Sequence, residues 1–221
     1  MAVIYLVRHG QASFGAADYD ALSELGRQQA RLAGQELAGR VRKPLRVSGT
    51  LRRQKDTATL LGPPGAVHDV IEDSRWNEYD HLQLIGRYAE AADFGGADSR
   101  GTDPGIVRDS RAFQTHLDSA LGRWIEQGPG GGWDSFVSGA VEALHALPDR
   151  LVPGQDAVVV TSGGVIAAAV GSLLAAPAPG IVALNRVMVN ASITAVLAGS
   201  SGLNLLSFNE HAHLGAARTY R

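Results

Sequence analysis

The chain has 221 residues, of which 45% are hydrophobic and 19% are charged, a composition typical of a globular domain with a buried core. Its formal net charge of −2 excludes the strongly basic surface that draws proteins to nucleic acids or membranes. The lack of cysteine excludes disulfides, thiolate catalysis and cysteine-ligated zinc. The first apolar run is too short to span a membrane and no basic leader precedes it, so we expect a cytoplasmic protein.

The first predicted element is a buried strand, Val3–Val7, that runs directly into Arg8, His9 and Gly10. In open α/β sheets, ligands bind beyond the carboxyl ends of the strands. Arginine grips two phosphoryl oxygens in a fork, imidazole can attack phosphorus, and glycine lets a ligand approach the backbone. The junction therefore indicates a phosphoryl site, against the alternative of an arginine–histidine pair that only forms a salt bridge.

The next predicted elements alternate between helix and strand. Apolar spacing predicts a helix over Leu22–Leu37, with Ser23 as its N-cap and Gly39 at its end. A short strand at Leu45–Val47 and a helix at Leu51–Leu61 follow. This alternation is typical of an α/β domain.

A second cation lies where that second helix begins. Amide groups and the macrodipole at a helix N-terminus attract anions. Arg53 lies in the first turns and would place a second guanidinium around the same anion as Arg8. The alternative for Arg53 is a basic helix face that is simply solvated. We interpret Arg52 and Lys55 in that way.

Carboxylates follow a further short strand, predicted at Val67–Ile71. One carboxylate beside a phosphoryl site can protonate a leaving oxygen and then deprotonate water. Glu78 and Asp80 both qualify by residue type. Most surface carboxylates are merely solvated, so the spacing alone does not decide between them.

The segment from Tyr79 to Trp133 is rich in glycine and proline, and its one convincing helix lies around Phe113–Ile125. Long irregular segments within compact domains tend to be functional covers. We therefore predict a single domain over residues 1–221, with a lid-like insertion at about 79–133.

The remaining elements are a helix, a buried strand, a helix of small residues and a hairpin. In chain order they are predicted at Asp134–Leu147, with Asp134 as N-cap, at Asp156–Thr161, at Gly163–Ala175, and at Ser192–Leu197 paired with Leu203–Phe208. The turn Ser162-Gly163-Gly164 has the strand–loop–helix geometry that binds anions, although any tight turn needs small residues. His211 and His213 have metal-ligand spacing, but two ligands make no site without partners, so we expect a structural role.

Taken in chain order, these segments resemble the histidine phosphatase superfamily, which contains cofactor-dependent phosphoglycerate mutases and many small phosphatases. The resemblance covers nearly the whole chain. Each segment alone is a weak signal, whereas their joint order is a strong one. The segments that carry it are Arg8-His9-Gly10, Leu22–Ala30, Ser48–Ala58 with Leu51, Arg53 and Thr57, the segment around Glu78, Ser162–Gly164 and Asn190–Ser192.

The resemblance implies a three-layer α/β/α fold with a mostly parallel sheet, and a two-step reaction that needs no metal or organic cofactor. His9 would attack phosphorus and become a phosphohistidine, while Arg8 and Arg53 hold the phosphoryl oxygens. Glu78 would protonate the leaving alcohol and then activate water. Further phosphate contacts are implied for Gln11, Ser13, Ser162 and Gly163.

Two positions depart from the family pattern. Ser162 stands where members usually carry a second histidine beside the phosphate, and Gly15 stands where many carry an asparagine. Serine supplies a hydrogen bond without positive charge, and a charge-assisted hydrogen bond is roughly twice as strong. His81, His211 or His213 could supply that charge. The nucleophile, both arginines and the acid are retained, which favours a working enzyme that is slowed by the loss of the second histidine.

We therefore expect a phosphatase that hydrolyses a small phosphate monoester. The runner-up is phosphoglycerate-mutase-type phosphoryl transfer. In the phosphoglycerate mutases that the chain resembles, the segment after the acid carries basic residues for the substrate carboxylate, whereas the segment after Glu78 has little excess positive charge. A catalytically weak phosphate-binding or regulatory protein is the alternative that Ser162 motivates. The expected partner is a small phosphorylated substrate, without nucleic acid or membrane, and a homodimer stays open.

Overall fold

The computed structural model describes residues 1–13, 20–63, 69–88, 110–128 and 130–220. Gly15, the start of the strand predicted at Val67–Ile71 and much of the predicted insertion lie outside the described residues. The chain divides into two compact units. The first comprises Met1–Glu78 and Ser138–Arg221, and the second comprises Tyr79–Val137.

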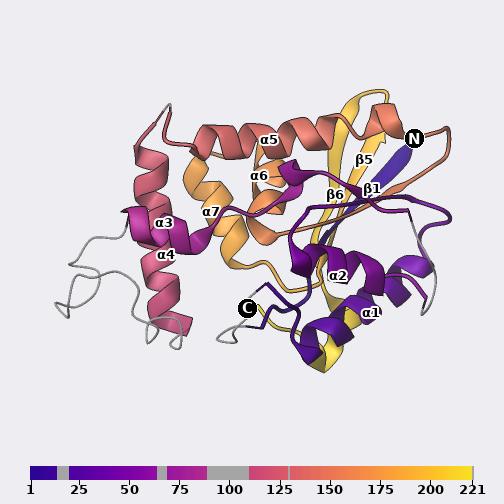
Figure 1. Ribbon diagram of the computed structural model, residues 1–221. Helices are drawn as coiled ribbons and strands as arrows, with labels where there is room; N and C mark the ends of the chain where they lie inside the picture. Colours follow the sequence, from indigo (N-terminus) through magenta and orange to yellow (C-terminus); the bar gives the residue numbers. More distant parts are fainter. Residues whose placement is uncertain (14–19, 64–68, 89–109, 129, 221) are drawn as a thin grey trace. The chain divides into compact units, whose positions relative to one another are not determined.

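The first unit is built on a six-stranded mixed sheet with the strand order β3-β2-β4-β1-β5-β6. Figure 1 labels three of these strands, β1, β5 and β6. Its strands are β1 (Ala2–Arg8), β2 (Leu45–Ser48), β3 (Ile71–Glu72), β4 (Ala157–Thr161), β5 (Ile193–Gly199) and β6 (Gly202–Glu210). β1 pairs in parallel with β4, and β2 pairs in parallel with β3 and β4, whereas β5 runs antiparallel to β1 and β6. The mostly parallel sheet and the terminal hairpin are thus confirmed, while β3 begins only at the last residue of the strand predicted at Val67–Ile71.

Helices cover both faces of this sheet. The helices of the first unit are α1 (Glu24–Ala38), α2 (Arg52–Leu60), α6 (Gly163–Leu173), α7 (Ala178–Arg186) and the end of α5 (Trp133–His145), with short 3-10 helices at Ser74–Trp76, Pro148–Arg150 and Ala212–Ala217. Tyr5 and Val7 of β1 share one buried cluster with α1 and α2. Ile4 and Leu6 point to the opposite face, where they are fully buried and α6 contacts β1. The predicted three-layer α/β/α arrangement is therefore confirmed.

Local capping explains where several helices begin. Ser23 caps α1 as predicted, because its hydroxyl accepts a hydrogen bond from the Gly26 amide at 3.0 Å, and Gly39 follows the helix end. The prediction of Asp134 as an N-cap is wrong, since α5 begins one residue earlier and Asp134 lies in its first turn, where a carboxylate still complements the helix dipole. No described helix combines the length and the apolar character needed to cross a bilayer.

The second unit contains α3 (His81–Tyr88), α4 (Ser110–Glu126) and the start of α5. Tyr79 packs edge-to-face on Trp124 and Phe136, with ring centroids 5.5 and 5.3 Å apart. Such aromatic contacts contribute about 0.5–1.5 kcal/mol each beyond the area they bury. α4 confirms the helix predicted around Phe113–Ile125, whereas α3 and α7 are too short to have shown a clear apolar period. The role of this unit as a lid stays a prediction.

Candidate active site

His9 lies immediately beyond the carboxyl end of β1, and its side chain is largely enclosed, since the residue is 7% exposed. Its backbone amide donates to the Thr161 carbonyl at 2.9 Å, which ties it to the end of β4. Its Nδ1 lies 2.7 Å from the Gly10 carbonyl oxygen, and only a protonated Nδ1 can bond there. In that tautomer Nε2 carries the lone pair, and it accepts a hydrogen bond from Arg53 Nε at 3.1 Å.

Gly10 follows His9 at a point where the main chain packs directly against α1. A Cβ atom at position 10 would lie 2.2 Å from the Gly26 carbonyl oxygen, a backbone contact that cannot yield. The Gly10 amide also donates to the Thr57 hydroxyl at 3.1 Å. Backbone packing against α1 and a hydrogen bond donated to Thr57 of α2 therefore fix the turn that carries His9.

Arg53 is anchored from the side opposite His9. It is 6% exposed, and its Nη1 lies 2.5 Å from Asp20 Oδ1. The second oxygen of Asp20 accepts the Arg52 amide at 2.7 Å, at the first residue of α2. Asp20 thereby holds both the guanidinium and the helix start. The sequence analysis missed Asp20, because nothing in a loop sequence shows which carboxylate turns toward a helix N-terminus.

Arg8 is the last residue of β1. Its Nη1 donates hydrogen bonds to the main-chain carbonyls of Met188 and Tyr220. Its Nε lies beside Gly163, where an added Cβ would be 3.5 Å from Nε and 2.8 Å from Asn185 Oδ1. The lack of a side chain at position 163 thus lets Asn185 Oδ1 and Arg8 Nε lie close to the main chain at the start of α6.

Glu78 ends the first part of the first unit, and its Oε2 accepts a hydrogen bond from the Gly164 amide at 2.9 Å. The carboxylate therefore lies at the N-terminus of α6, which directly follows β4. Asp80, the other carboxylate candidate, accepts the Gln83 amide at 2.9 Å and so caps the start of α3. The structure thus gives Asp80 a local structural role and places Glu78 next to Ser162-Gly163-Gly164.

Ser162 is fully buried at the junction of β4 and α6. Its Oγ accepts a hydrogen bond from Gln54 Nε2 at 2.9 Å and makes no capping bond to its own helix. Gln54 is also fully buried, on the same side of α2 as Thr57 and Ala58. The sequence analysis missed Gln54, although a polar residue at helical spacing among buried positions is a signal that could have found it.

Gln11 and Ser13 follow His9 in the chain. The Gln11 amide donates to Gln29 Oε1 at 2.9 Å, and its own side-chain Oε1 accepts from the Ser23 hydroxyl at 2.9 Å. The Ser13 amide donates to the Ala21 carbonyl at 2.8 Å, and the residue is half-buried. These bonds fold the loop back onto the start of α1.

The two C-terminal histidines bind backbone carbonyls. His211 Nδ1 lies 2.6 Å from the Asn209 oxygen, and His213 Nε2 lies 3.0 Å from the Ala191 oxygen. Burial lowers the pKa of His213 below its ordinary value of 6.5, so this ring is a poor source of positive charge at neutral pH. Both rings line a cavity of about 500 Å³ with Arg40.

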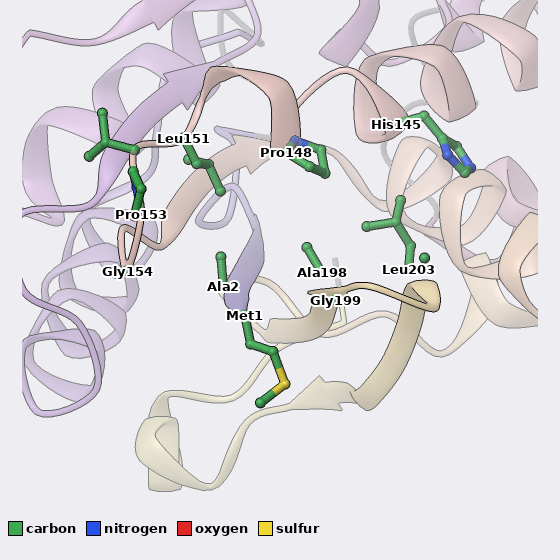
Figure 2. A pocket seen from close by; sticks show the side chains of 12 residues that line it. Met1, Ala2, His145, Pro148, Leu151, Pro153, Gly154, Ala198, Gly199 and Leu203 are labelled. Carbon is green, nitrogen blue, oxygen red and sulfur yellow. The ribbon is translucent and has the colours of Figure 1, made fainter.

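Another cavity, of about 350 Å³, lies at the amino end of β1, beside Met1, His145 and Leu203 (Figure 2). None of the residues proposed for the phosphoryl site lines it, because those residues follow the carboxyl ends of the strands.

In the part of the chain that the structure describes, no group of three or more His, Asp or Glu side chains could hold a metal ion.

Comparison with known proteins identifies the family to which this fold belongs. The model of the histidine phosphatase superfamily (branch 1) matches residues 4–211. A metal-independent phosphoserine phosphatase from Arabidopsis thaliana is 27% identical over 222 residues, which cover 96% of this chain and 83% of that protein.

Solved structures share the fold across the whole length. A phosphoserine phosphatase from Entamoeba histolytica has a TM-score of 0.63 at 18% identity, with 97% of this chain and 100% of that chain covered. A mycobacterial glucosyl-3-phosphoglycerate phosphatase has a TM-score of 0.50 at 26% identity, with 96% and 100% covered. With its family model matched from residue 4 to residue 211, the chain belongs to branch 1 of the histidine phosphatase superfamily.

Proposed function

We propose that this protein is a phosphatase that hydrolyses small phosphate monoesters through a phosphohistidine on His9. One observation carries the proposal: His9 Nε2, the acceptor atom of the ring, meets Arg53 Nε at 3.1 Å. A nucleophilic lone pair and a cationic fork of donors thus lie at one place. Phosphoryl transfer depends chiefly on such positioning and on cationic stabilisation.

The first step transfers the phosphoryl group to the protein. The Nε2 lone pair of His9 forms an N–P bond as the ester O–P bond breaks, and Glu78, entering as the carboxylic acid, gives its proton to the leaving oxygen. Arg53 and Arg8 hold the phosphoryl oxygens, whose negative charge they stabilise in the transition state.

The second step returns the protein to its starting state. Water attacks phosphorus while the Glu78 carboxylate accepts its proton. The N–P bond breaks, its electron pair returns to His9 Nε2, and inorganic phosphate leaves. Glu78 is then protonated again and ready for the next ester.

Smaller contributions come from the surrounding residues. The Ser162 hydroxyl accepts from Gln54 and keeps its own proton, which it can donate to a phosphoryl oxygen. Gln11, Ser13 and the backbone at Gly163 would add further hydrogen bonds. Because Ser162 stands where the family usually has a histidine, the site lacks one positive charge. We expect slower transfer, by less than the about 10²–10³-fold that follows the outright loss of a donor.

The family implies a small phosphorylated substrate, and the relatives suggest which to try first. The Arabidopsis relative is a phosphoserine phosphatase at 27% identity, so phosphoserine is the first substrate to test. Glucosyl-3-phosphoglycerate is the second, because a mycobacterial phosphatase of that name is 26% identical.

Trapping the covalent intermediate tests the proposal. Protein mixed with radiolabelled phosphoserine or p-nitrophenyl phosphate and quenched in alkali should retain label, because phosphohistidine survives alkali and is lost in acid. His9→Ala should lose both the label and phosphate release, whereas His145→Ala, an exposed histidine on α5, should keep both. Undiminished phosphate release by His9→Ala would overturn the proposal.

The same experiment separates the other interpretations. A phosphoglycerate-mutase-type enzyme would form the adduct and release an isomerised ester in place of free phosphate. A phosphate-binding protein, the case that Ser162 motivates, would bind inorganic phosphate yet form no adduct and cleave no ester. Whether the protein forms a homodimer is a separate question, which sedimentation of the purified protein answers.

A further inference from the structure

Two buried side chains hold the main-chain carbonyl of Trp76. Gln54 Nε2 donates to this oxygen at 2.9 Å, and the Thr161 hydroxyl donates to it at 2.6 Å. Both donors are fully buried, and Trp76 itself is 1% exposed. A carbonyl oxygen has two lone pairs, so these two bonds satisfy it completely.

The next two residues also make hydrogen bonds to neighbouring elements. Asn77 Oδ1 accepts the Thr50 amide and Asn77 Nδ2 donates to the Thr50 hydroxyl, each at 2.7 Å. Glu78 Oε2 accepts the Gly164 amide at 2.9 Å. Three consecutive residues are therefore anchored in turn by a carbonyl, an amide side chain and a carboxylate, which leaves the carboxyl group of Glu78 little freedom to move.

We propose that Gln54 and Thr161 are positioning residues for Glu78, acting through the Trp76 carbonyl. The inference rests on the proposed function, because it takes Glu78 as the general acid. Gln54 follows Arg53 on α2, and Thr161 ends β4 opposite Arg8 of β1. The elements that carry the phosphoryl site thus also set the distance between the acid and the leaving oxygen, and an error of about 1 Å in such a distance can cost about 10²-fold in rate.

The two donors differ in what else they touch, and this difference makes the test sharper. The second hydrogen of the Gln54 amide goes to Ser162 Oγ at 2.9 Å, so a substitution of Gln54 also disturbs a proposed phosphate contact. No such bond links the Thr161 side chain to Ser162 among the hydrogen bonds described. Thr161→Val keeps the shape and removes only the donor, which makes it the cleaner variant.

The experiment compares phenyl phosphate with p-nitrophenyl phosphate, two esters of similar shape. Nitrophenolate leaves with little help from an acid, whereas phenolate needs a proton. Thr161→Val should lower kcat for phenyl phosphate by about 10-fold or more, change KM little, and leave p-nitrophenyl phosphate within about threefold. Gln54→Met also removes the bond to Ser162, so it should slow both esters, and phenyl phosphate more than p-nitrophenyl phosphate. Thr161→Ser, which keeps the hydroxyl, should retain the rate with both esters.

Ser48→Ala serves as the matched control. Ser48 is fully buried at the end of β2, and its hydroxyl has no hydrogen-bond partner among the described residues. Removing it tests the effect of losing a buried hydroxyl without losing a contact to Trp76. Thermal unfolding of each variant confirms that it is folded, and either donor variant alone is sufficient for the comparison.

Each substitution is also made together with Glu78→Gln. Once the acid is gone, losing its positioning should cost little more, so the effects of Thr161→Val and Glu78→Gln should fall well short of additive. Equal losses with both esters, or a full additional loss in the double variant, would overturn the inference while the proposed function stands. If Glu78→Gln itself does not distinguish the two esters, the assignment of the acid falls, and the inference falls with it.

Discussion

The Nε atom of Arg53 donates a hydrogen bond to the Nε2 atom of His9 across 3.1 Å. The cation that would hold a phosphoryl group therefore contacts the very atom that would attack it. An incoming phosphate can take over the guanidinium's hydrogen bonds with its oxygens while Nε2 approaches phosphorus. In the proposed reaction the orientation of Arg53 would set the geometry, and Asp20, at 2.5 Å from its Nη1, holds that orientation.

Asp20→Ala should weaken the binding of the phosphoryl group by Arg53. The substitution removes the charged partner of the guanidinium and an acceptor of the Arg52 amide at the start of α2. We expect kcat/KM to fall by about 10- to 100-fold and inorganic phosphate to inhibit more weakly, as steady-state kinetics would measure. Asp56→Ala is the control, because Asp56 makes only a 3.7 Å ion pair with Arg52 on the exposed side of α2. Equal losses in the two variants would contradict the role of Asp20.

Glu78→Gln should slow hydrolysis in proportion to the need of the leaving group for a proton. Glutamine keeps the shape and can no longer donate as an acid, so kcat for an alkyl ester such as phosphoserine should fall by about 10²-fold or more. The loss with p-nitrophenyl phosphate should be much smaller. Asp80→Asn, at the cap of α3, should affect the two substrates alike. Equal losses for Glu78→Gln would argue that another group is the acid.

If the proposed site is short of one positive charge, a histidine at position 162 should supply it only when space is made for the ring. Ser162 is fully buried against Gln54, and overpacking such a position costs about 1–3 kcal/mol. We therefore expect Ser162→His alone to lower the melting temperature. Combined with Gln54→Ala, it should hydrolyse p-nitrophenyl phosphate about 10-fold faster than Gln54→Ala does. No gain in a folded double variant would mean that another group already supplies the charge.

The half-buried ring of His213 should make stability depend on pH. Burial lowers its pKa from 6.5, with Glu36, Arg40 and Glu210 as the charged groups around it. The unfolded chain therefore binds a proton at a higher pH than the folded one does. The contribution of His213 is fully present above about pH 6.5 and is lost as the pH falls from there toward the lower pKa of the folded state.

His213→Gln removes this titration and keeps an amide donor in place of the Nε2–H group that bonds the Ala191 carbonyl. Urea unfolding of both proteins at about pH 7.5 and about pH 5.5 would measure the effect. The free energy of unfolding should fall more steeply toward acid in the unsubstituted protein. A difference between the two proteins that stays constant across this window would contradict the prediction.

The sequence predicted the architecture because the patterns that specify it are local. Apolar runs and helical spacing identify β1, β4 and α1 within a few residues, and Ser23 and Gly39 mark the helix ends. The strand predicted at Val67–Ile71 overlaps β3 at Ile71 alone, because two residues hold too little of a period to locate a strand, and α7 was not predicted. The α/β fold class therefore followed from the sequence, while the boundaries of its shortest elements did not.

The candidate site divides in the same way. By itself the sequence determined that His9, Arg53 and Ser162-Gly163 follow strand ends, and strand ends of a parallel sheet converge at one edge whatever the loops do. Only the tertiary structure decided that Asp20 orients Arg53 and that Gln54 and Thr161 hold the Trp76 carbonyl. These bonds join residues far apart in the chain, and their formation depends on loop paths and side-chain directions that no local pattern encodes.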